Sequence, residues 1–175
     1  MNQLNPWKKL SSRVVYANPW ITLREDQVIR PDGKVGIYSV VDTRVATGIL
    51  ALTPESELYL VGQYRYAVGE YSWEIIEGGV ESGEEPLEAA KRELREEAGL
   101  VACRWWQLGG EIHLSNCFTS ELARLYVAQD LEEVPKDPEG TEVLEIKRLP
   151  FRECLSMVQR GEIRMPCCLL YTSDA

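Results

Sequence analysis

The stretch of this sequence that most constrains its fold runs from Gly78 to Leu100 and combines a glycine-rich loop with one helix. Three glycines near its start can adopt positive φ and let the backbone approach a ligand closely. Pro86 suits the first helical position, because its missing N–H would be unpaired there in any case. Strong helix formers fill positions 87–98, and Gly99 stands where a glycine commonly ends a helix. The sequence therefore predicts a loop followed by one well-delimited helix.

The predicted helix has two different faces. Glu93 and Glu97 lie one turn apart, with Glu96 beside them, and neighbouring carboxylates on a helix destabilise it. A hard cation such as Mg²⁺ or Mn²⁺ reverses that repulsion, because carboxylate oxygens are its preferred ligands. A solvated acidic face is the plainer interpretation of such a charge run. The other face is an apolar stripe that must be buried, made of Leu87, Ala90, Leu94 and Ala98.

The spacing of the whole stretch favours the metal-binding interpretation. Gly78, Glu84 and the run Arg92-Glu93-Leu94-x-Glu96-Glu97-x-Gly99-Leu100 resemble the complete signature of the Nudix hydrolase family, with every defined position filled. The resemblance implies an α/β fold, the Nudix-type α/β/α sandwich with a mixed sheet. It also implies a hydrolase that uses Mg²⁺ or Mn²⁺ to cut a diphosphate linked to another group.

Motif position assigns roles to individual residues by the same resemblance. Glu96 and Glu97 would be catalytic, and Gly78 and Gly99 would be structural positions of the motif. Glu84 and Arg92 would hold the loop and the helix together by ion pairing. The metal ligands would be Glu93, Glu96, Glu97 and the backbone carbonyl of Glu77.

Length, charge and cysteine content narrow the class of protein. A chain of 175 residues can build one domain with its own core, and a net charge of −9 argues against binding nucleic acid or an anionic membrane. The five cysteines show no CxxC spacing, and no signal peptide or transmembrane run is recognised, so reduced thiols in a cytoplasm are expected. The lone His113 has no partner at zinc-ligand spacing.

The section before residue 45 is predicted to form antiparallel strands around 13–16, 20–29 and 36–41, with a hairpin turn at Pro31-Asp32-Gly33. ADP-ribose pyrophosphatases and their nucleoside diphosphate sugar relatives carry such an N-terminal sheet, which helps to form their dimer and nucleoside pocket. By resemblance, 1–175 is a single Nudix domain in which 1–44 serves those two purposes and 45–175 is the catalytic core. Trp20, Tyr38 and Tyr16 are candidates to stack on the base or to pack in a dimer.

Three strands are expected before the loop, over Val45–Leu52, Leu58–Gln63 and Tyr71–Ile76. The triplet Gln63-Tyr64-Arg65 looks like one that these relatives carry, in which the arginine contacts the diphosphate. A guanidinium suits that task because its planar donors bind phosphate oxygens bidentately. An edge strand with a snorkelling arginine is the alternative. Glu74 corresponds to an acidic residue that precedes the motif in these relatives, and we assign it to substrate binding.

Beyond the helix, strands are expected over Cys103–Leu108, Glu111–Leu114 and Leu122–Ala128. Glu121, in the loop before the last of these, is a candidate substrate contact or a loop cap. The loop resembles one that carries a proline in ADP-ribose pyrophosphatases, but here Asn116 lies near the expected place and no proline stands between Gly99 and Val134. This departure points away from strict ADP-ribose specificity, toward nucleoside diphosphate sugars in general.

The acidic segment Glu132–Glu145 is expected to be a loop, and loops of this length in compact domains are often functional. In related enzymes the corresponding loop supplies a glutamate that acts as general base on the attacking water. Glu142 is the first candidate and Glu139 the second, and a merely solvated acidic loop is the alternative. A strand over Val143–Leu149, a helix over Pro150–Gln159 closed by Gly161 and a last helix over Met165–Tyr171 are expected to follow.

Together these features predict a metal-dependent pyrophosphohydrolase of nucleoside diphosphate sugars such as ADP-ribose, ADP-glucose or GDP-mannose. The products would be a nucleoside monophosphate and a sugar 1-phosphate. The expected partners are that small-molecule nucleotide and a second copy of the chain in a homodimer, with no nucleic acid and no membrane. Three alternatives stay open: a Nudix hydrolase of dinucleoside polyphosphates or nucleoside triphosphates, a catalytically silent nucleotide sensor, and a structural module with an acidic helix.

Overall fold

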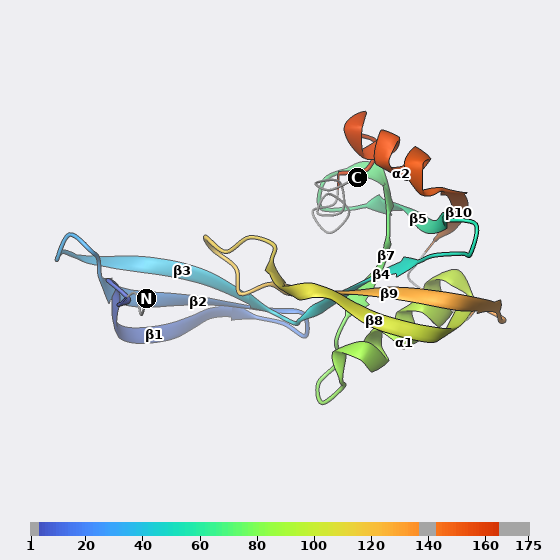
Figure 1. Cartoon of the computed structure of the whole chain (residues 1–175). Helices are drawn as coiled ribbons and strands as arrows, with labels where there is room; N and C mark the ends of the chain where they lie inside the picture. Colours follow the sequence, from blue (N-terminus) through green and yellow to red (C-terminus); the bar gives the residue numbers. More distant parts are fainter. Residues whose placement is uncertain (1–3, 137–142, 165–175) are drawn as a thin grey trace. The chain divides into compact units, whose positions relative to one another are not determined.

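The computed structural model describes residues 4–136 and 143–164 (Figure 1). Its contacts divide the chain into two compact units. The first unit comprises the residues up to Arg44 together with His113–Leu122, and the second comprises Val45–Ile112 and the residues from Ala123 onward. The first boundary between the units follows Arg44. The inclusion of 113–122 in the first unit was not predicted.

The first unit is built on a three-stranded antiparallel sheet of β1 (Lys8–Ala17), β2 (Ile21–Ile29) and β3 (Val35–Thr43), in that order. The N-terminal antiparallel sheet predicted from the sequence is therefore confirmed, with a longer first strand than expected. Gly33 adopts a φ of 80° in the turn between β2 and β3, which a residue with a side chain would rarely accept. The loop before β9 runs along β3, because the Val41 N–H donates to the Phe118 carbonyl at 2.9 Å.

The second unit contains two sheets. One is mixed, in the order β7-β4-β9-β8, because β4 pairs antiparallel with β7 and parallel with β9. The other is antiparallel, in the order β10-β5-β6. The strands of the mixed sheet are β4 (Ala46–Ala51), β7 (Ile76–Gly79), β8 (Leu100–His113) and β9 (Leu122–Glu133), and those of the antiparallel sheet are β5 (Glu57–Arg65), β6 (Glu70–Glu74) and β10 (Glu145–Pro150).

Two helices cover this pair of sheets from opposite sides, α1 (Pro86–Ala98) and α2 (Phe151–Gln159). Leu94 of α1 is fully buried against Ile49 of β4, and burying such a side chain contributes roughly 1.5–3 kcal/mol. Leu50, the next residue of β4, points to the other face and lines a small apolar cavity with Cys154 of α2. The sheets thus lie between the helices, and the predicted α/β/α arrangement is confirmed.

Several predicted element boundaries were wrong. The strand expected over Tyr71–Ile76 is divided at Ile75, because the chain there passes from the antiparallel sheet into the mixed sheet. The two strands expected over 103–114 are one continuous β8, in which Gly109 takes a positive φ of 67° without ending the strand. Strand β9 continues to Glu133, so the acidic loop begins later than expected, and the helix expected over Met165–Tyr171 lies outside the described residues.

No helix in the described part of the chain is a candidate to span a membrane. Neither α1 nor α2 combines the length and the apolar character that crossing a bilayer requires.

Candidate active site

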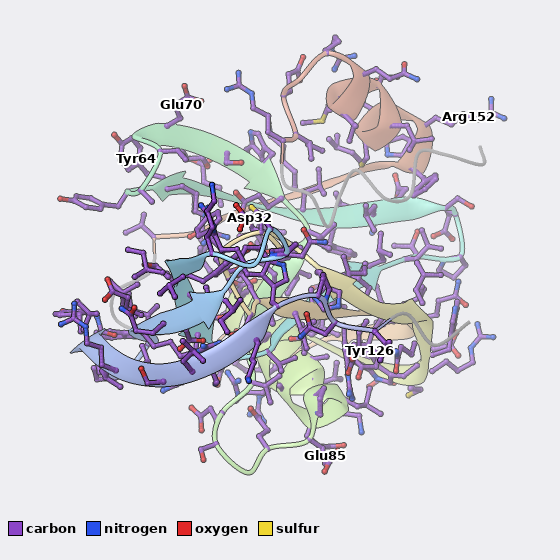
Figure 2. The ribbon with its side chains drawn as sticks, turned by 90° about the vertical axis from the view of Figure 1, so that its left-hand side faces the viewer. Asp32, Tyr64, Glu70, Glu85, Tyr126 and Arg152 are labelled. Carbon is purple, nitrogen blue, oxygen red and sulfur yellow. The ribbon has the colours of Figure 1, made fainter. Side chains whose placement is uncertain are left out.

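Helix α1 forms where the sequence predicts it because both of its ends are defined by local chemistry. Pro86 occupies the first turn, and Gly99 adopts a left-handed conformation with a φ of 66°, its N–H donating to the Arg95 carbonyl at 3.0 Å. Glu85, just before the helix, points into solvent (Figure 2). The acidic face is not uniformly solvated, because Glu97 is 97% buried whereas Glu93 and Glu96 are half-buried.

Strand β7 lies at the edge of the mixed sheet and offers its free side to this acidic face. The Val80 N–H donates to Val45 at 2.8 Å, so alternate residues of this segment bond to β4 and the others point away from it. Accordingly, the Glu77 N–H donates to Glu97 Oε2 at 3.2 Å, and the Gly79 carbonyl accepts from Arg92 at 2.9 Å. Since the N–H and C=O of one strand residue point to the same side, the Glu77 carbonyl also lies on the side of Glu97.

Gly78 is the point of closest approach between β7 and α1. A Cβ atom at this position would lie 1.9 Å from the Cδ atom of Glu93, so the Glu93 side chain would have to move. Glycine therefore lets the strand pass against the carboxylate of Glu93 without displacing it.

Arg92 joins the loop, the strand and the helix, and we call Glu84, Arg92, Glu93 and Glu96 the Arg92 cluster. The Nε and Nη2 atoms of Arg92 donate to the two carboxylate oxygens of Glu84 at 3.1 and 3.2 Å. The Nη1 atom of Arg92 donates to Glu93 at 2.7 Å and to Glu96 at 2.9 Å. The bond to Glu84 is the main reason that the pKa of Arg92 is raised, and the same bond lowers the pKa of Glu84. Both groups are therefore charged at neutral pH.

A second set of charged residues, which we call the Arg65 cluster, contains Arg65 of β5, Glu74 of β6 and Glu77 of β7. Arg65 Nε donates to the two oxygens of Glu74 at 2.9 and 3.2 Å, and Nη2 contacts both Glu74 and Glu77. Burial by itself would raise the pKa of Glu74, but the bonds from Arg65 and Ser72 outweigh it and hold that pKa below its ordinary value. Burial likewise opposes the charge of Arg65, yet Glu74, Glu77 and Glu97 raise its pKa.

Together with Glu97, the two clusters carry six glutamates and two arginines in the described part of the chain, so the carboxylates are in excess. No three of their carboxylates are already gathered into a metal cage among residues 4–136 and 143–164, since Arg92 lies between Glu93 and Glu96. The donor chemistry nevertheless fits a hard divalent cation. Three carboxylates share one helical face, and a backbone carbonyl on the adjoining strand edge faces the same way.

The other predicted site residues belong to the first unit or lie outside the described residues. The Glu121 carbonyl accepts from the Leu114 N–H at 3.3 Å, and the Glu121 N–H donates to the Thr119 hydroxyl at 3.3 Å. Trp20 is 70% exposed and Tyr16 is 54% exposed. The Tyr38 hydroxyl donates to the Cys117 carbonyl at 2.5 Å. Glu139 and Glu142, the two candidate bases, are not among the described residues.

Sequence reasoning missed two features of these units. One is the side chain of Glu77, for which only the backbone carbonyl was considered and which contacts Arg65. The other is a hollow of about 370 Å³ on the N-terminal sheet. The residues that line the hollow include Trp7, Lys9, Arg24, Asp26 and Tyr38.

Comparison with protein families accounts for nearly the whole chain. Residues 7–41 match the nucleoside diphosphate sugar hydrolase N-terminal domain, and residues 42–166 match the NUDIX domain. The chain belongs to the Nudix family. It is therefore a hydrolase, and members of this family generally require a divalent metal.

Individual relatives of this Nudix hydrolase cover most of its length. It is 33% identical over 160 residues to an ADP-ribose pyrophosphatase of Mycobacterium tuberculosis, a match that covers 90% of this chain and 77% of that protein. It is 27% identical over 158 residues to an ADP-ribose pyrophosphatase of Bacillus subtilis, covering 89% and 85%. The crystal structure of an ADP compounds hydrolase superposes with a TM-score of 0.85 at 22% identity, covering 98% and 93% of the two chains. The predicted Nudix fold is thus confirmed.

Proposed function

We propose that this Nudix hydrolase cleaves the diphosphate of nucleoside diphosphate sugars, ADP-ribose among them, to a nucleoside monophosphate and a sugar phosphate, with Mg²⁺ or Mn²⁺ bound. The observation that carries the proposal is the acidic face of α1 against the free edge of β7, where buried Glu97 accepts the Glu77 N–H. The match of residues 7–41 and the names of the two pyrophosphatase relatives support the substrate class.

Each side chain of the second unit then has a defined task. Glu93, Glu96, Glu97 and the Glu77 carbonyl would hold the cation, which supplies charge neutralisation for the diphosphate and a more acidic water. Arg65 donates to a phosphate oxygen. Glu142, or else Glu139, accepts the proton of the water that attacks phosphorus while the bridging P–O bond breaks.

The first unit supports a nucleoside-binding and dimer-forming role for residues 1–44. Tyr38 meets the Trp7 ring edge to face at 5.2 Å beside the hollow, and aromatic rings of this kind stack on bases. Trp20 and Glu121 remain further candidates for substrate contact. We also propose that the chain acts in the cytoplasm, without binding nucleic acid or membranes.

A homodimer would cover apolar side chains that the outer strands of the N-terminal sheet expose. Val14 of β1 is 64% exposed and Ile37 of β3 is 59% exposed, and the strand register places them on opposite faces of the sheet. We expect either Val14→Lys or Ile37→Lys to give monomers in sedimentation velocity experiments with a dimeric wild type. A monomeric wild type, or a dimer retained in both variants, would contradict this part of the proposal.

The experiment that tests the activity measures phosphate-ester release with Mg²⁺ from ADP-ribose, ADP-glucose, GDP-mannose, a dinucleoside polyphosphate and ATP. Glu97→Gln should lower kcat about 10²- to 10³-fold on the diphosphate sugars. Glu88→Gln is the matched control, because Glu88 lies on the exposed side of the same helix and pairs with Lys91. Faster turnover of ATP or the polyphosphate would favour another Nudix specificity. Nucleotide binding without any turnover would favour a sensor.

A further inference from the structure

The Arg65 guanidinium uses one edge for protein contacts and leaves the other end for a ligand. Its Nε is taken by both oxygens of Glu74, and Nη2 is shared between Glu74 and Glu77. A guanidinium has five N–H donors, and the two on Nη1 have no bond to any residue in 4–136 or 143–164. The Arg65 side chain is 36% exposed, so part of it is open to solvent or to a ligand.

Strand geometry places Arg65 on the inner face of the β5–β6 hairpin. Tyr64, its neighbour in β5, points outward and is 62% exposed (Figure 2). Because successive side chains of a strand alternate between faces, Arg65 lies on the opposite face, the same one as Glu74. The register sets Arg65 opposite Glu70, so the guanidinium must reach back along the hairpin to contact Glu74.

Glu74 itself is unsuited to contact an anionic substrate. Its side chain is only 4% exposed, and both of its carboxylate oxygens already accept bonds from Arg65. A diphosphate placed against this carboxylate would meet a like charge without a donor. The sequence suggested that Glu74 binds substrate, but its carboxylate has almost no exposed surface with which to do so.

We infer that Glu74 is a positioning residue, which holds the Nε–Nη2 edge of Arg65 and thereby presents the Nη1 end to the diphosphate. The inference rests on the proposed function. The sequence suggested a bidentate contact of Arg65 with the phosphate oxygens, whereas here only the Nη1 end of its guanidinium donates to them. Glu77 is the second anchor, and its backbone N–H binds Glu97. The position of Arg65 is thus set by the same strand that orients the most buried carboxylate of α1.

The test compares Glu74→Gln, Arg65→Lys and the double variant by kcat and KM on the diphosphate sugar that the wild type hydrolyses best. Glu74→Gln should raise KM about tenfold with kcat changed by less than about threefold, because a fixed donor to the ground-state diphosphate is lost. The double variant should be no worse than Arg65→Lys alone, because both changes remove the same contact. Glu74→Asp keeps the negative charge but moves it away from Arg65, because the side chain is shorter. Its KM should lie between those of wild type and Glu74→Gln.

The matched control is Glu70→Gln, because Glu70 lies at the far end of β6 (Figure 2). It is exposed and pairs with Arg164. Its KM should stay within about twofold of wild type. An unchanged KM in Glu74→Gln would overturn the inference. Additive effects in the double variant would also overturn it, because independent losses are expected of a merely structural carboxylate.

Failure of the proposed function gives a different result from failure of this inference. If the wild type hydrolyses no diphosphate sugar, the same variants are compared by calorimetric Kd for ADP-ribose. Weaker binding in Glu74→Gln but not in Glu70→Gln then supports the positioning role while the proposed activity falls. An equal Kd in all of them overturns the positioning role as well.

Discussion

The Arg92 cluster and the Arg65 cluster use the same chemistry but are assembled in opposite ways. The Arg92 cluster comes from one continuous segment, Glu84–Glu96, and water reaches its carboxylates, of which Glu96 is 25% exposed. The Arg65 cluster comes from three strands in two sheets, and its central carboxylate, Glu74, is 4% exposed. The difference teaches that a local cluster follows from spacing, whereas a non-local cluster depends on strand register and costs more to disrupt.

The largest effect is expected at Gly78, where the strand passes against the Arg92 cluster. Gly78→Ala places a Cβ atom 1.9 Å from Cδ of Glu93 and must displace that carboxylate, so kcat should fall about 10²-fold. Gly79→Ala is the neighbouring control, because nothing lies within 4 Å of its Cβ position and its φ is not positive. Steady-state kinetics on both variants check this. Equal activities would show that Glu93 is not held where the structure has it.

Removing Arg65 should be the next largest effect and should appear in stability. Arg65→Met leaves Glu74 buried without its cation, so we expect the free energy of unfolding to fall by about 2–3 kcal/mol at pH 7. Urea denaturation measures it. Arg104→Met, which breaks an exposed pair with Asp130, should cost less than about 1 kcal/mol. A smaller loss at Arg65 than at Arg104 would mean that Glu74 finds another partner.

The corresponding change in the local cluster should cost less. Arg92→Met should lower the free energy of unfolding by about 1–2 kcal/mol, because water can solvate the carboxylates it leaves. Added Mg²⁺ should restore part of that loss, since a cation can replace the guanidinium between Glu93 and Glu96. Arg95→Met on the same helix serves as the control. If Arg92→Met proves more destabilising than Arg65→Met, the ranking of the two clusters is reversed.

The smallest expected effect is the loss of folding stability at acidic pH that comes from Glu84. Arg92 holds the pKa of Glu84 below its ordinary value of 4.5, so ionised Glu84 stabilises the folded state at neutral pH. That contribution is present above the unfolded pKa and disappears as the pH falls through the lowered folded pKa. Glu84→Gln should therefore be less stable than wild type by less than about 1 kcal/mol at pH 7, and the difference should vanish toward pH 3. Thermal unfolding across this range measures it; a constant difference would show that Glu84 acts without its charge.

The sequence predicted what depends on neighbours along the chain. Helix α1 between Pro86 and Gly99 and the hairpin turn at Gly33 each rest on a few consecutive residues, and each is found as expected. In these two cases backbone preference and helical periodicity were sufficient. The pairing of Glu84 with Arg92 was expected from the resemblance to the Nudix signature, and it is present.

The rest depended on partners that no local pattern specifies. The break at Ile75 arises because β6 and β7 pair in different sheets, and the continuity of β8 arises from its pairing along β9. The contact between Arg65 and the Glu77 side chain requires both sheets to be in place. Such contacts are set by long-range packing, which overrides the turn preference of Gly109 and Gly110.

The free edge of β7 also bears on how copies of this protein avoid one another. An edge strand with unpaired N–H and C=O groups can recruit a strand from another molecule, which is a common route to aggregation. Here the Glu77 N–H and the Gly79 carbonyl are bonded to side chains of α1, and the carboxylates beside them would repel an acidic second copy. The side chains that line the candidate site thereby also hinder intermolecular strand addition. Substitutions that empty this edge are expected to increase association as well as to lower activity.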